Sequence, residues 1–265
     1  MRIVTVINAK GGCGKSTIAM NLAAALAADG FRTLLIDLDP QAQVTAWLNA
    51  GDGLTSLGTI VMPMAGKQPI GGVIQGTKIV NLSFVASAQP LEDLGRQMTE
   101  EEDYHLRLTE VLGDLVDRFE FCVMDSPNQI SPIMENAITP ADLFIVPFES
   151  TKAVKSYANV YALVQRIRGE EPLALHVLSN LSRLQGHRKR VIELMEHDGI
   201  ARAPTEIRTC GWLAQVDEHG GSIFHYRPHA NGAKDILGLK EHVLVTLGLK
   251  SPPDALTIGR AQLVA

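Results

Sequence analysis

Cysteine is scarce in this sequence. Its 265 residues include three cysteines, at positions 13, 122 and 210, and no two of them form a C-x-x-C pair. Structural zinc sites and the disulfide frameworks of small secreted domains need more closely spaced cysteines than these. We therefore expect neither kind of cross-link, and this cysteine usage is typical of proteins from a reducing cytoplasm.

The sequence also lacks long hydrophobic stretches. No window approaches the roughly 18 uninterrupted apolar residues that predict a transmembrane helix. The first apolar stretch, RIVTVI at residues 2–7, is too short for the core of a signal peptide. Residues 251–265 carry one arginine and one aspartate, unlike a basic amphipathic helix that lies on a membrane. We expect a cytoplasmic protein with no membrane partner.

Positive charge is not in excess either. Lysine and arginine number 24 against 29 aspartates and glutamates, so the formal net charge is −5. A protein that binds nucleic acid through an overall basic surface is therefore not expected, although a local basic patch remains open. Hydrophobic residues make up 46% of the chain and charged residues 20%, which is typical of a soluble globular protein and excludes a disordered chain.

The predicted strands and helices alternate in the order expected of an α/β fold. Residues Arg2–Ile7 and Thr33–Ile36 have the composition of strands, and Ser16–Ala28 is an Ala- and Leu-rich helix between them. A strand–helix–strand unit of this kind implies parallel strands joined by a right-handed crossover. Further strands are predicted at residues 81–86, 121–124, 143–147 and 173–178, and further helices at 104–118, 154–167, 191–197 and 233–247.

These elements predict one α/β domain, residues 1–250, followed by a tail, residues 251–265. We expect a doubly wound, mostly parallel sheet of about six to eight strands with helices on both faces. In such a sheet, ligands bind beyond the carboxyl ends of the strands. Residues 51–78 contain seven glycines and little periodicity, so loops and one short helix are expected there.

A glycine-rich loop lies between the first strand and the first helix. Glycines let backbone N–H groups surround phosphate oxygens, and the following helix directs its positive end at the same anion. In such a loop Lys15 reaches the β- and γ-phosphates, the Ser16 hydroxyl binds Mg²⁺ and Thr17 bonds an inner phosphate. The loop therefore predicts a site for ATP and Mg²⁺. The residues expected to bind the nucleotide are Gly11, Gly12, Cys13, Gly14, Lys15, Ser16 and Thr17.

Two features distinguish this loop from the common phosphate-binding pattern. Ala9 stands where that pattern has glycine, and Lys10 adds a second lysine. The sequence K-G-G-x-G-K-[ST]-T resembles the deviant Walker A motif of the ParA/MinD family of P-loop ATPases. The resemblance implies a slow ATPase that dimerises with ATP sandwiched between two subunits. It also implies that Lys10 crosses to the partner's phosphates and acts there as an arginine finger does, whereas the residues alone also allow a solvated loop lysine.

Two aspartates follow the second predicted strand. Asp37 and Asp39 belong to the sequence D-L-D-P-Q, which is similar to a D-x-D-P-Q segment of the family. Strand alternation places both carboxylates on the same side, at the phosphate end of the sheet. The match implies that Asp39 orients or activates the attacking water and that Asp37 helps to hold Mg²⁺ through a water. From the residues alone, the pair could instead be a helix cap and a turn residue.

A third aspartate ends the hydrophobic run FCVM. Asp125 at this place matches the Walker B pattern, in which the carboxylate reaches Mg²⁺ through a water. Ser126 and Pro127 continue the family's D-[ST]-P segment, but Asn128 replaces the second proline that the family commonly has. The resemblance extends to the strand that ends at Asn180, whose side chain is a candidate for reading adenine, with a turn-capping asparagine as the alternative.

A basic cluster follows that strand. Arg183, Arg188, Lys189 and Arg190 place four positive charges within eight residues of an acidic protein. Related partition ATPases carry DNA-binding arginines in this region, so the resemblance implies contacts with the phosphates of nonspecific DNA. Runs of charge are also common on solvated faces, and that alternative stays open.

The resemblance as a whole implies a cytoplasmic, nucleoid-associated ATPase that segregates or positions a cargo. ATP and Mg²⁺ would bridge a homodimer, the dimer would bind DNA, and a ParB-like or cargo adaptor protein would stimulate hydrolysis. The sequence leaves two other classes open: an ATP-dependent switch that binds protein partners without DNA, and a P-loop ligase or kinase for a small molecule. Iron–sulfur reductases that share the loop are not expected, because their cluster needs suitably placed cysteines.

Overall fold

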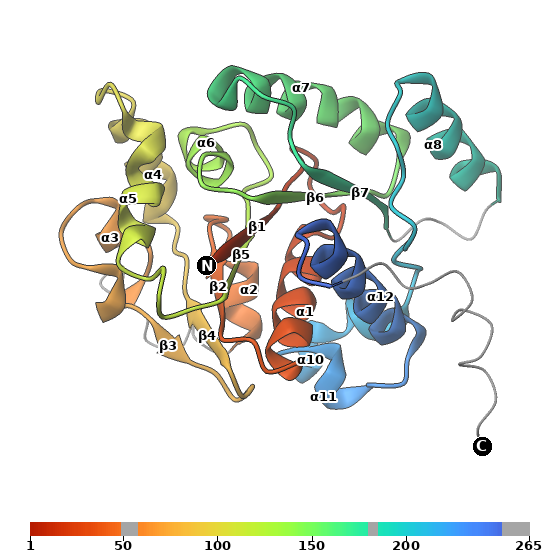
Figure 1. The fold of residues 1–265 in the computed structure, drawn as a ribbon, viewed down its shortest axis with the longest axis horizontal. Coiled ribbons are helices and arrows are strands. Elements are labelled where there is room, and N and C mark those ends of the chain that lie inside the picture. Colours follow the sequence, from red (N-terminus) through yellow and green to blue (C-terminus); the bar gives the residue numbers. More distant parts are fainter. Residues whose placement is uncertain (49–57, 180–184, 251–265) are drawn as a thin grey trace.

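The computed structural model describes residues 1–48, 58–179 and 185–250, with only the backbone described at Gln185 and Asp217. Within these ranges the chain forms a seven-stranded sheet covered by helices on both faces (Figure 1). In order across the sheet, the strands are β3 (Gln75–Gly76), β4 (Leu82–Val85), β2 (Thr33–Asp37), β5 (Phe121–Asp125), β1 (Arg2–Val6), β6 (Leu143–Phe148) and β7 (Ala174–Leu178).

The strands run parallel, except that β3 pairs antiparallel with β4. From β1 the chain proceeds to β2 and β4 on one side, returns to β5 beside β1, and continues to β6 and β7 on the other side. This order confirms the predicted doubly wound α/β fold. It also places the loop after β1 between the ends of β5 and β6, where open α/β sheets bind their ligands.

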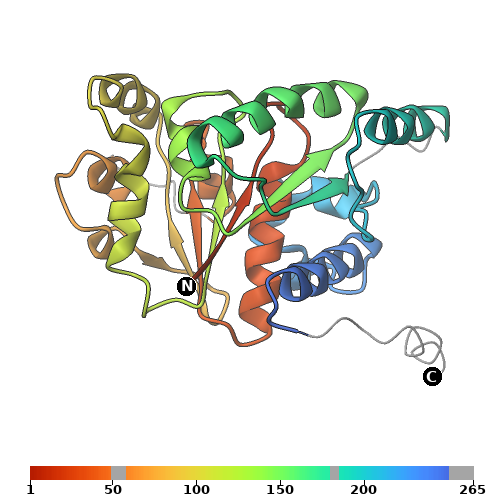
Figure 2. The ribbon, with the colours of Figure 1, turned by 45° about the horizontal axis from the view of Figure 1, so that its top comes forward.

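The helices form a layer on each face of the sheet. Figure 2 shows α1 and α12 side by side on one face and α7 on the other. None of the helices in the described ranges is both long and apolar enough to span a lipid bilayer. The α-helices are α1 (Lys15–Ala28), α2 (Gln43–Trp47), α3 (Val61–Met64), α4 (Pro90–Met98), α5 (Arg107–Gly113), α6 (Pro132–Ile138), α7 (Thr151–Arg168), α8 (Gln185–His197), α9 (Gly211–Ala214), α10 (Val216–His219), α11 (Ile223–Tyr226) and α12 (Asn231–Thr246).

Alternate residues of each strand pack into opposite layers. In β5, Phe121 and Val123 pack in the same layer as α1 and α12, whereas Cys122 and Met124 pack with residues of α3 to α6. Every residue of β2 and β5 is buried, because helices cover both faces of the parallel sheet. The helix α1 is mostly apolar around its circumference for the same reason: eleven of its fourteen residues are buried, and the helix packs against the sheet, α2, α11 and α12.

The outer side of β7 is covered by residues 202–207. Two isolated parallel bridges join this segment to β7 and to the residue that follows it. The backbone N–H groups of Ala203 and Ile207 donate to the carbonyl oxygens of His176 and Leu178, each at 2.8 Å. The edge strand is therefore paired on both sides, and the covering segment continues toward the loop after β1.

The structure differs from the sequence prediction in two segments. The helix predicted for residues 104–118 is a 3₁₀ turn followed by α5, which ends at Gly113 because glycine disfavours helix. The segment expected to hold loops and one short helix contains α3, a 3₁₀ turn and the antiparallel strand β3 in its described part, residues 58–78. The helices α2, α4, α9, α10 and α11 were not predicted, since four to nine residues give little periodicity.

Asn21 connects α1 to the C-terminal part of the chain. Its buried side chain donates to the carbonyl oxygen of Thr17 at 2.8 Å. Its own oxygen accepts from the Ser222 hydroxyl at 3.0 Å and from the backbone N–H of Ile223 at 2.8 Å. One amide oxygen therefore accepts from two buried donors at the start of α11.

We expect Asn21→Ala to lower the free energy of unfolding by about 2–3 kcal/mol, because two buried donors lose their acceptor. Chemical denaturation monitored by circular dichroism measures the change. The matched control is Asn159→Ala on the exposed side of α7, which should shift the free energy by no more than about 0.5 kcal/mol. Equal unfolding midpoints for wild type and Asn21→Ala would contradict this role.

Candidate functional site

The loop after β1 has the backbone shape of an anion-binding loop. Gly12 and Gly14 adopt φ angles of +78° and +94°, in the left-handed region that favours glycine. Gly14 is also the N-cap of α1, so the positive end of that helix dipole lies at the loop. This combination of free N–H groups and a helix N-terminus fits a phosphate group.

Hydrogen bonds hold the loop in this shape. The carbonyl oxygen of Lys10 accepts from Lys15 Nζ at 3.3 Å and from the Cys13 thiol at 3.1 Å. The carbonyl oxygen of Cys13 accepts from the hydroxyl of Ser179, just after β7, at 2.9 Å. Cys13 is fully buried, and burial raises the pKa of its thiol, so its contribution is packing and backbone rather than thiolate chemistry.

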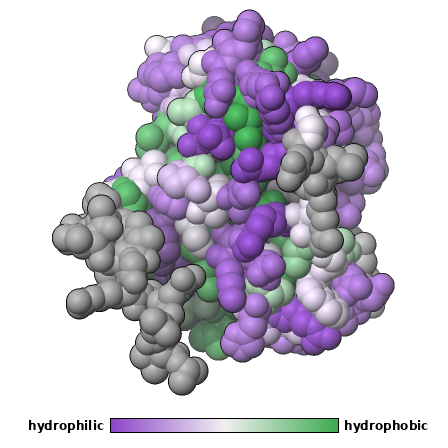
Figure 3. Space-filling view, turned by 90° about the vertical axis from the view of Figure 1, so that its right-hand side faces the viewer, coloured by the Kyte–Doolittle hydropathy of each residue, from purple (hydrophilic) through white to green (hydrophobic). Residues whose placement is uncertain are grey.

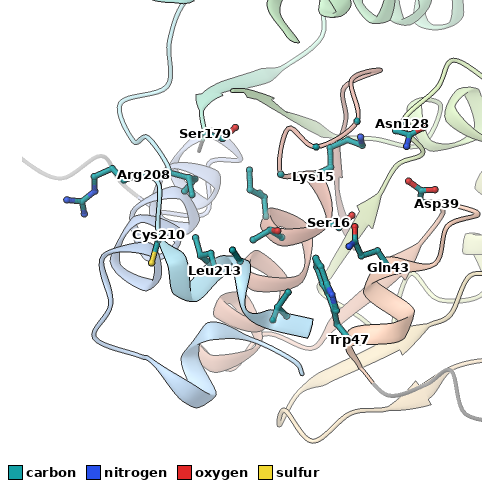
Figure 4. A pocket seen from close by; sticks show the side chains of 18 residues that line it. Lys15, Ser16, Asp39, Gln43, Trp47, Asn128, Ser179, Arg208, Cys210 and Leu213 are labelled. Carbon is teal, nitrogen blue, oxygen red and sulfur yellow. The ribbon is translucent and has the colours of Figure 1, made fainter. Parts of the chain in front are cut away.

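A cavity of about 290 Å³ extends from the loop (Figure 4). Asp39, Gln43 and Asn128 lie on one side of it, and Arg208 and Leu213 on the other. The end at the loop is polar, whereas the far wall is mostly apolar, which fits the phosphates and the base of a nucleotide. The residues that line it are Gly11, Gly12, Gly14, Lys15, Ser16, Thr17, Ile18, Asp39, Gln43, Trp47, Asn128, Ser179, Ile207, Arg208, Cys210, Leu213, Ala214 and Val216.

Two of the predicted aspartates lie side by side in the sheet. Asp37 ends β2 and Asp125 ends β5, and the two residues are paired in register. Leu35 and Val123, two positions earlier, pack in the layer of α1, so strand alternation directs both carboxylates to the same layer. The sheet therefore brings these carboxylates to the N-terminal end of α1.

The two carboxylates differ in their partners. One oxygen of Asp37 accepts from the N–H and the hydroxyl of Thr45 at 2.9 and 2.8 Å, and the other accepts from the N–H of Asp39 at 3.1 Å. Among the described residues, neither oxygen of Asp125 has a hydrogen-bond partner of normal geometry. Asp37 therefore anchors α2, as in the helix-cap alternative left open by the sequence, and its part in holding Mg²⁺ stays a prediction.

Burial makes both carboxylates reluctant to ionise. It raises the pKa of Asp37 to about 7. Burial and the neighbouring charge of Asp37 raise the pKa of Asp125 well above its usual range, while the nearby Ser16 hydroxyl and Lys15 oppose the shift. A buried carboxylate without a partner has the chemistry that a divalent cation satisfies.

The residues present fit Mg²⁺. In the part of the chain that the structure describes, no three His, Cys, Asp or Glu side chains converge into a metal site of their own. Mg²⁺ usually takes one or two protein oxygens and completes its shell with phosphate oxygens and water. Ser16 and Asp125 would supply the protein oxygens here.

Asp39 lies beyond the end of β2 and lines the cavity. One of its oxygens accepts from the backbone N–H of Gln41 at 2.9 Å, which holds the side chain in a turn. Figure 4 shows the carboxylate on the same side of the cavity as Asn128. A carboxylate held in this way is suited to orient a water molecule opposite the phosphate loop.

Lys10 lies beside the cavity and is not part of its lining. Its ammonium group contacts the carbonyl oxygen of Gly11 and is 3.8 Å from a carboxylate oxygen of Glu149. The side chain is directed to its own loop in the single chain, and its role at a partner's phosphates stays a prediction.

The described part of the basic cluster lies on α8. Arg188 pairs with Glu206 at 2.8 Å and Lys189 with Glu193 at 3.6 Å, and Arg190 is exposed. The side of the molecule that carries α8 is mostly hydrophilic (Figure 3). These residues therefore form a solvated face away from the cavity lining, partly neutralised by acidic neighbours, and DNA binding there stays a prediction.

Two candidate residues, Asn180 and Arg183, lie outside the described residues. The structure adds Ser179, which precedes Asn180 and bonds to the phosphate loop. It also adds the far wall of the cavity, from Ile207 to Val216, which the sequence did not indicate. The one sequence signal there is that six of the ten residues 207–216 are apolar.

The chain is similar to known proteins along most of its length. Residues 1–176 match the family model described as an AAA domain. The chromosome-partitioning ATPase Soj of Treponema pallidum is 31% identical over 253 residues, covering 93% of this chain and 98% of that protein. The sporulation initiation inhibitor protein Soj of Bacillus subtilis is 25% identical over 256 residues, covering 91% and 98%.

Solved structures share the fold. The apo structure of McdA from Cyanothece has a TM-score of 0.81 at 21% identity, covering 92% of this chain and 99% of that one. Cobyrinic acid a,c-diamide synthase from Mycobacterium smegmatis, solved with an ATP analogue and magnesium, has a TM-score of 0.75 at 19% identity, covering 94% and 96%. At these identities the likeness concerns the fold alone.

We expect Asp125→Asn to stabilise the protein without ligands and to weaken its response to metal. At pH 8 in EDTA, replacing a buried carboxyl group that is costly to ionise beside Asp37 should raise the free energy of unfolding by about 1–3 kcal/mol. The stabilisation that wild type gains from Mg²⁺ and ATP should be largely lost, because the metal loses a carboxylate. Thermal unfolding with and without Mg²⁺ and ATP measures both effects.

The control for this change is Asp117→Asn, an exposed aspartate, which should alter neither quantity. A lower stability of Asp125→Asn than of wild type in EDTA would show that the fold itself needs the carboxylate.

Proposed function

The chain belongs to the ParA/MinD family of P-loop ATPases, and we propose that it binds ATP with Mg²⁺ and hydrolyses it to position or segregate a cargo. In this proposal residues 1–250 form the ATPase domain of a cytoplasmic protein that works on the nucleoid. Two copies sandwich ATP, the dimer binds nonspecific DNA, and a ParB-like or cargo adaptor protein stimulates hydrolysis. The partition function of the Treponema relative supports this assignment.

The observation that carries the proposal is the convergence of the phosphate loop, Asp125 and Asp39 at one cavity. The loop residues and Asp39 line the cavity, and Asp125 lies buried beside the loop, near Ser16, with no hydrogen-bond partner of normal geometry among the described residues. A phosphate site, a metal-binding oxygen and a carboxylate for water are the parts that phosphoryl transfer to water requires. The convergence of these three parts favours an ATPase over a protein whose glycine-rich turn has only a structural role.

Each residue has its own task in this mechanism. Lys15 Nζ, which donates to the carbonyl oxygen of Lys10, would turn to the β- and γ-phosphates. Ser16 and Asp125 would hold Mg²⁺, which when bound neutralises charge on the phosphate oxygens. Asp39 would orient the attacking water. The wall from Ile207 to Val216 would enclose the base, and Asn180 is the proposed hydrogen-bonding partner of adenine.

Lys10 would complete the site of a second copy. It lies at the start of the loop with a partly exposed side chain, so its ammonium group is available at the surface. A cation added at the transferring phosphate stabilises the charge that develops there. Hydrolysis would then depend on dimerisation, which explains why a single subunit is expected to turn over slowly.

The basic face of α8 would bind DNA through phosphates. Arg188, Lys189 and Arg190 are exposed there, and Arg183 would join them. Exposed ion pairs such as those of Arg188 and Lys189 contribute only about 0–1 kcal/mol, so DNA phosphates can compete for these side chains. Such binding is independent of base sequence and weakens with salt.

We expect Asp39→Ala to lower kcat for ATP hydrolysis about 100-fold or more, because the attacking water loses its orienting carboxylate. ATP binding and ATP-dependent dimerisation should remain within about twofold of wild type. Phosphate release gives the rate, and titration with a fluorescent ATP analogue gives the affinity. Normal turnover in this variant would remove Asp39 from the mechanism.

Binding to nonspecific double-stranded DNA is expected with ATP and Mg²⁺ but not with ADP and Mg²⁺. The variant with Arg188, Lys189 and Arg190 all changed to alanine should bind DNA at least about tenfold more weakly. A plot of its log Kd against log salt concentration should have a smaller slope, as expected for the loss of about two to three phosphate contacts. Fluorescence anisotropy across a salt series measures both. The control removes the same charge by changing Lys67, Lys78 and Arg118 to alanine, three exposed residues that lie outside α8.

The same experiment separates the other two classes of function. Intact ATP binding without DNA binding in either nucleotide state would indicate a switch that acts on protein partners. ATP turnover that depends on a small metabolite, and not on DNA or protein, would indicate a ligase or kinase.

A further inference from the structure

Glu149 is an acidic residue beside the phosphate loop. It follows β6 directly, and β6 is hydrogen-bonded to β1, so the residue lies next to the start of the loop. Its side chain is only 17% exposed. A largely buried negative charge at this place needs an explanation, because the loop itself is shaped to bind an anion.

The two carboxylate oxygens of Glu149 have different surroundings. One oxygen accepts from the Ser150 hydroxyl at 2.8 Å and lies 3.8 Å from Lys10 Nζ. The other oxygen is buried and has no hydrogen-bond partner among the described residues. Among the residues that the structure describes, Lys10 is the one cation at ion-pair distance from Glu149. The lysine therefore balances a charge that burial would otherwise leave uncompensated.

This pair fixes where Lys10 points in the single chain. The ammonium group contacts the carbonyl oxygen of Gly11, the next residue, so the side chain is folded back onto its own loop. A lysine that serves the phosphates of another copy has to extend away from this position. Such an extension would separate it from Glu149.

We propose that Glu149 is a positioning residue that holds Lys10 retracted on its own loop until two nucleotide-bound subunits meet. The inference rests on the proposed function, in which Lys10 reaches the phosphates of a second copy. Dimer formation then breaks two Lys10–Glu149 pairs and leaves two carboxylates without their cation. Glu149 thereby opposes dimer formation and keeps basal hydrolysis low.

The charge of Glu149 can be removed without changing its shape. Glu149→Gln keeps an oxygen that can accept from Ser150, and the N-cap of α7 remains, because it is the Ser150 hydroxyl that accepts from Ala153 N–H. The backbone carbonyl oxygen of Glu149, 3.0 Å from a ring nitrogen of His187, is also unchanged. The substitution therefore tests the ion pair and not the fold.

The experiment measures self-association of the full chain by sedimentation equilibrium with a non-hydrolysable ATP analogue and Mg²⁺. We expect Glu149→Gln to lower the Kd of the dimer about tenfold. Loss of one partly exposed ion pair changes an equilibrium constant about threefold, and the dimer contains two such pairs, one in each subunit. At protein concentrations below the dimer Kd, and without DNA or partner protein, the rate of basal ATP hydrolysis should rise several-fold. In a Lys10→Ala background, the same substitution should change neither quantity.

The matched control is Glu196→Gln, which removes one exposed negative charge from α8 and should leave the dimer Kd unchanged. If wild type dimerises with nucleotide but the dimer Kd of Glu149→Gln is equal to or higher than that of wild type, the role of Glu149 is overturned. The proposed function would remain intact. Tightening that persists in the Lys10→Ala background would also overturn the role of Glu149, because the charge would then act without the lysine. A wild-type chain that does not dimerise with nucleotide would overturn the proposed function, and this inference with it.

Discussion

Two carboxylates buried against each other at the ends of neighbouring strands are the constraint on which the rest of the site depends. Asp37 and Asp125 are paired in register at the carboxyl edge of the sheet, where burial disfavours negative charge. Thr45 and the N–H of Asp39 satisfy Asp37, and the N-terminus of α1 faces the pair with its positive end. Neither oxygen of Asp125 has a hydrogen-bond partner of normal geometry among the described residues, so its ionised form is the less satisfied of the two. This arrangement is the physical basis of the proposed Mg²⁺ site, because a divalent cation would stabilise the ionised form of Asp125.

The local part of this arrangement could be predicted from the sequence. The glycine-rich loop follows a strand without interruption, and two hydrophobic runs end in aspartate, so each signal is contained in a few consecutive residues. Parallel packing then brings these strand ends together whatever the lengths of the connections. The same reasoning predicted the doubly wound sheet. It could not predict β3, because two residues carry no periodicity, nor decide between the two roles of Asp37, because its partner Thr45 lies on a helix too short to recognise.

The rest of the site depends on contacts between residues that are far apart in the chain. Ser179 and Cys13 are separated by 166 positions, yet their hydrogen bond fixes the shape of the phosphate loop. The wall from Ile207 to Val216 and the pairing of Lys10 with Glu149 are of the same kind. Such contacts follow from which strand lies beside which, and no pattern within a short window records that choice. For this reason the sequence identifies the end of the cavity at the glycine-rich loop and not its far wall.

The cover over β7 limits how copies of this chain can aggregate. An open strand edge can add the strand of another molecule, and sheets extended in this way are slow to come apart. Here residues 202–207 already occupy the outer side of β7, and the opposite edge ends in the two-residue β3. Both ends of the sheet are poor templates for lateral growth. Copies of this chain that meet in a crowded cell therefore contact each other through side chains and not by adding strands to the sheet. Such contacts can separate without any part of the sheet unfolding.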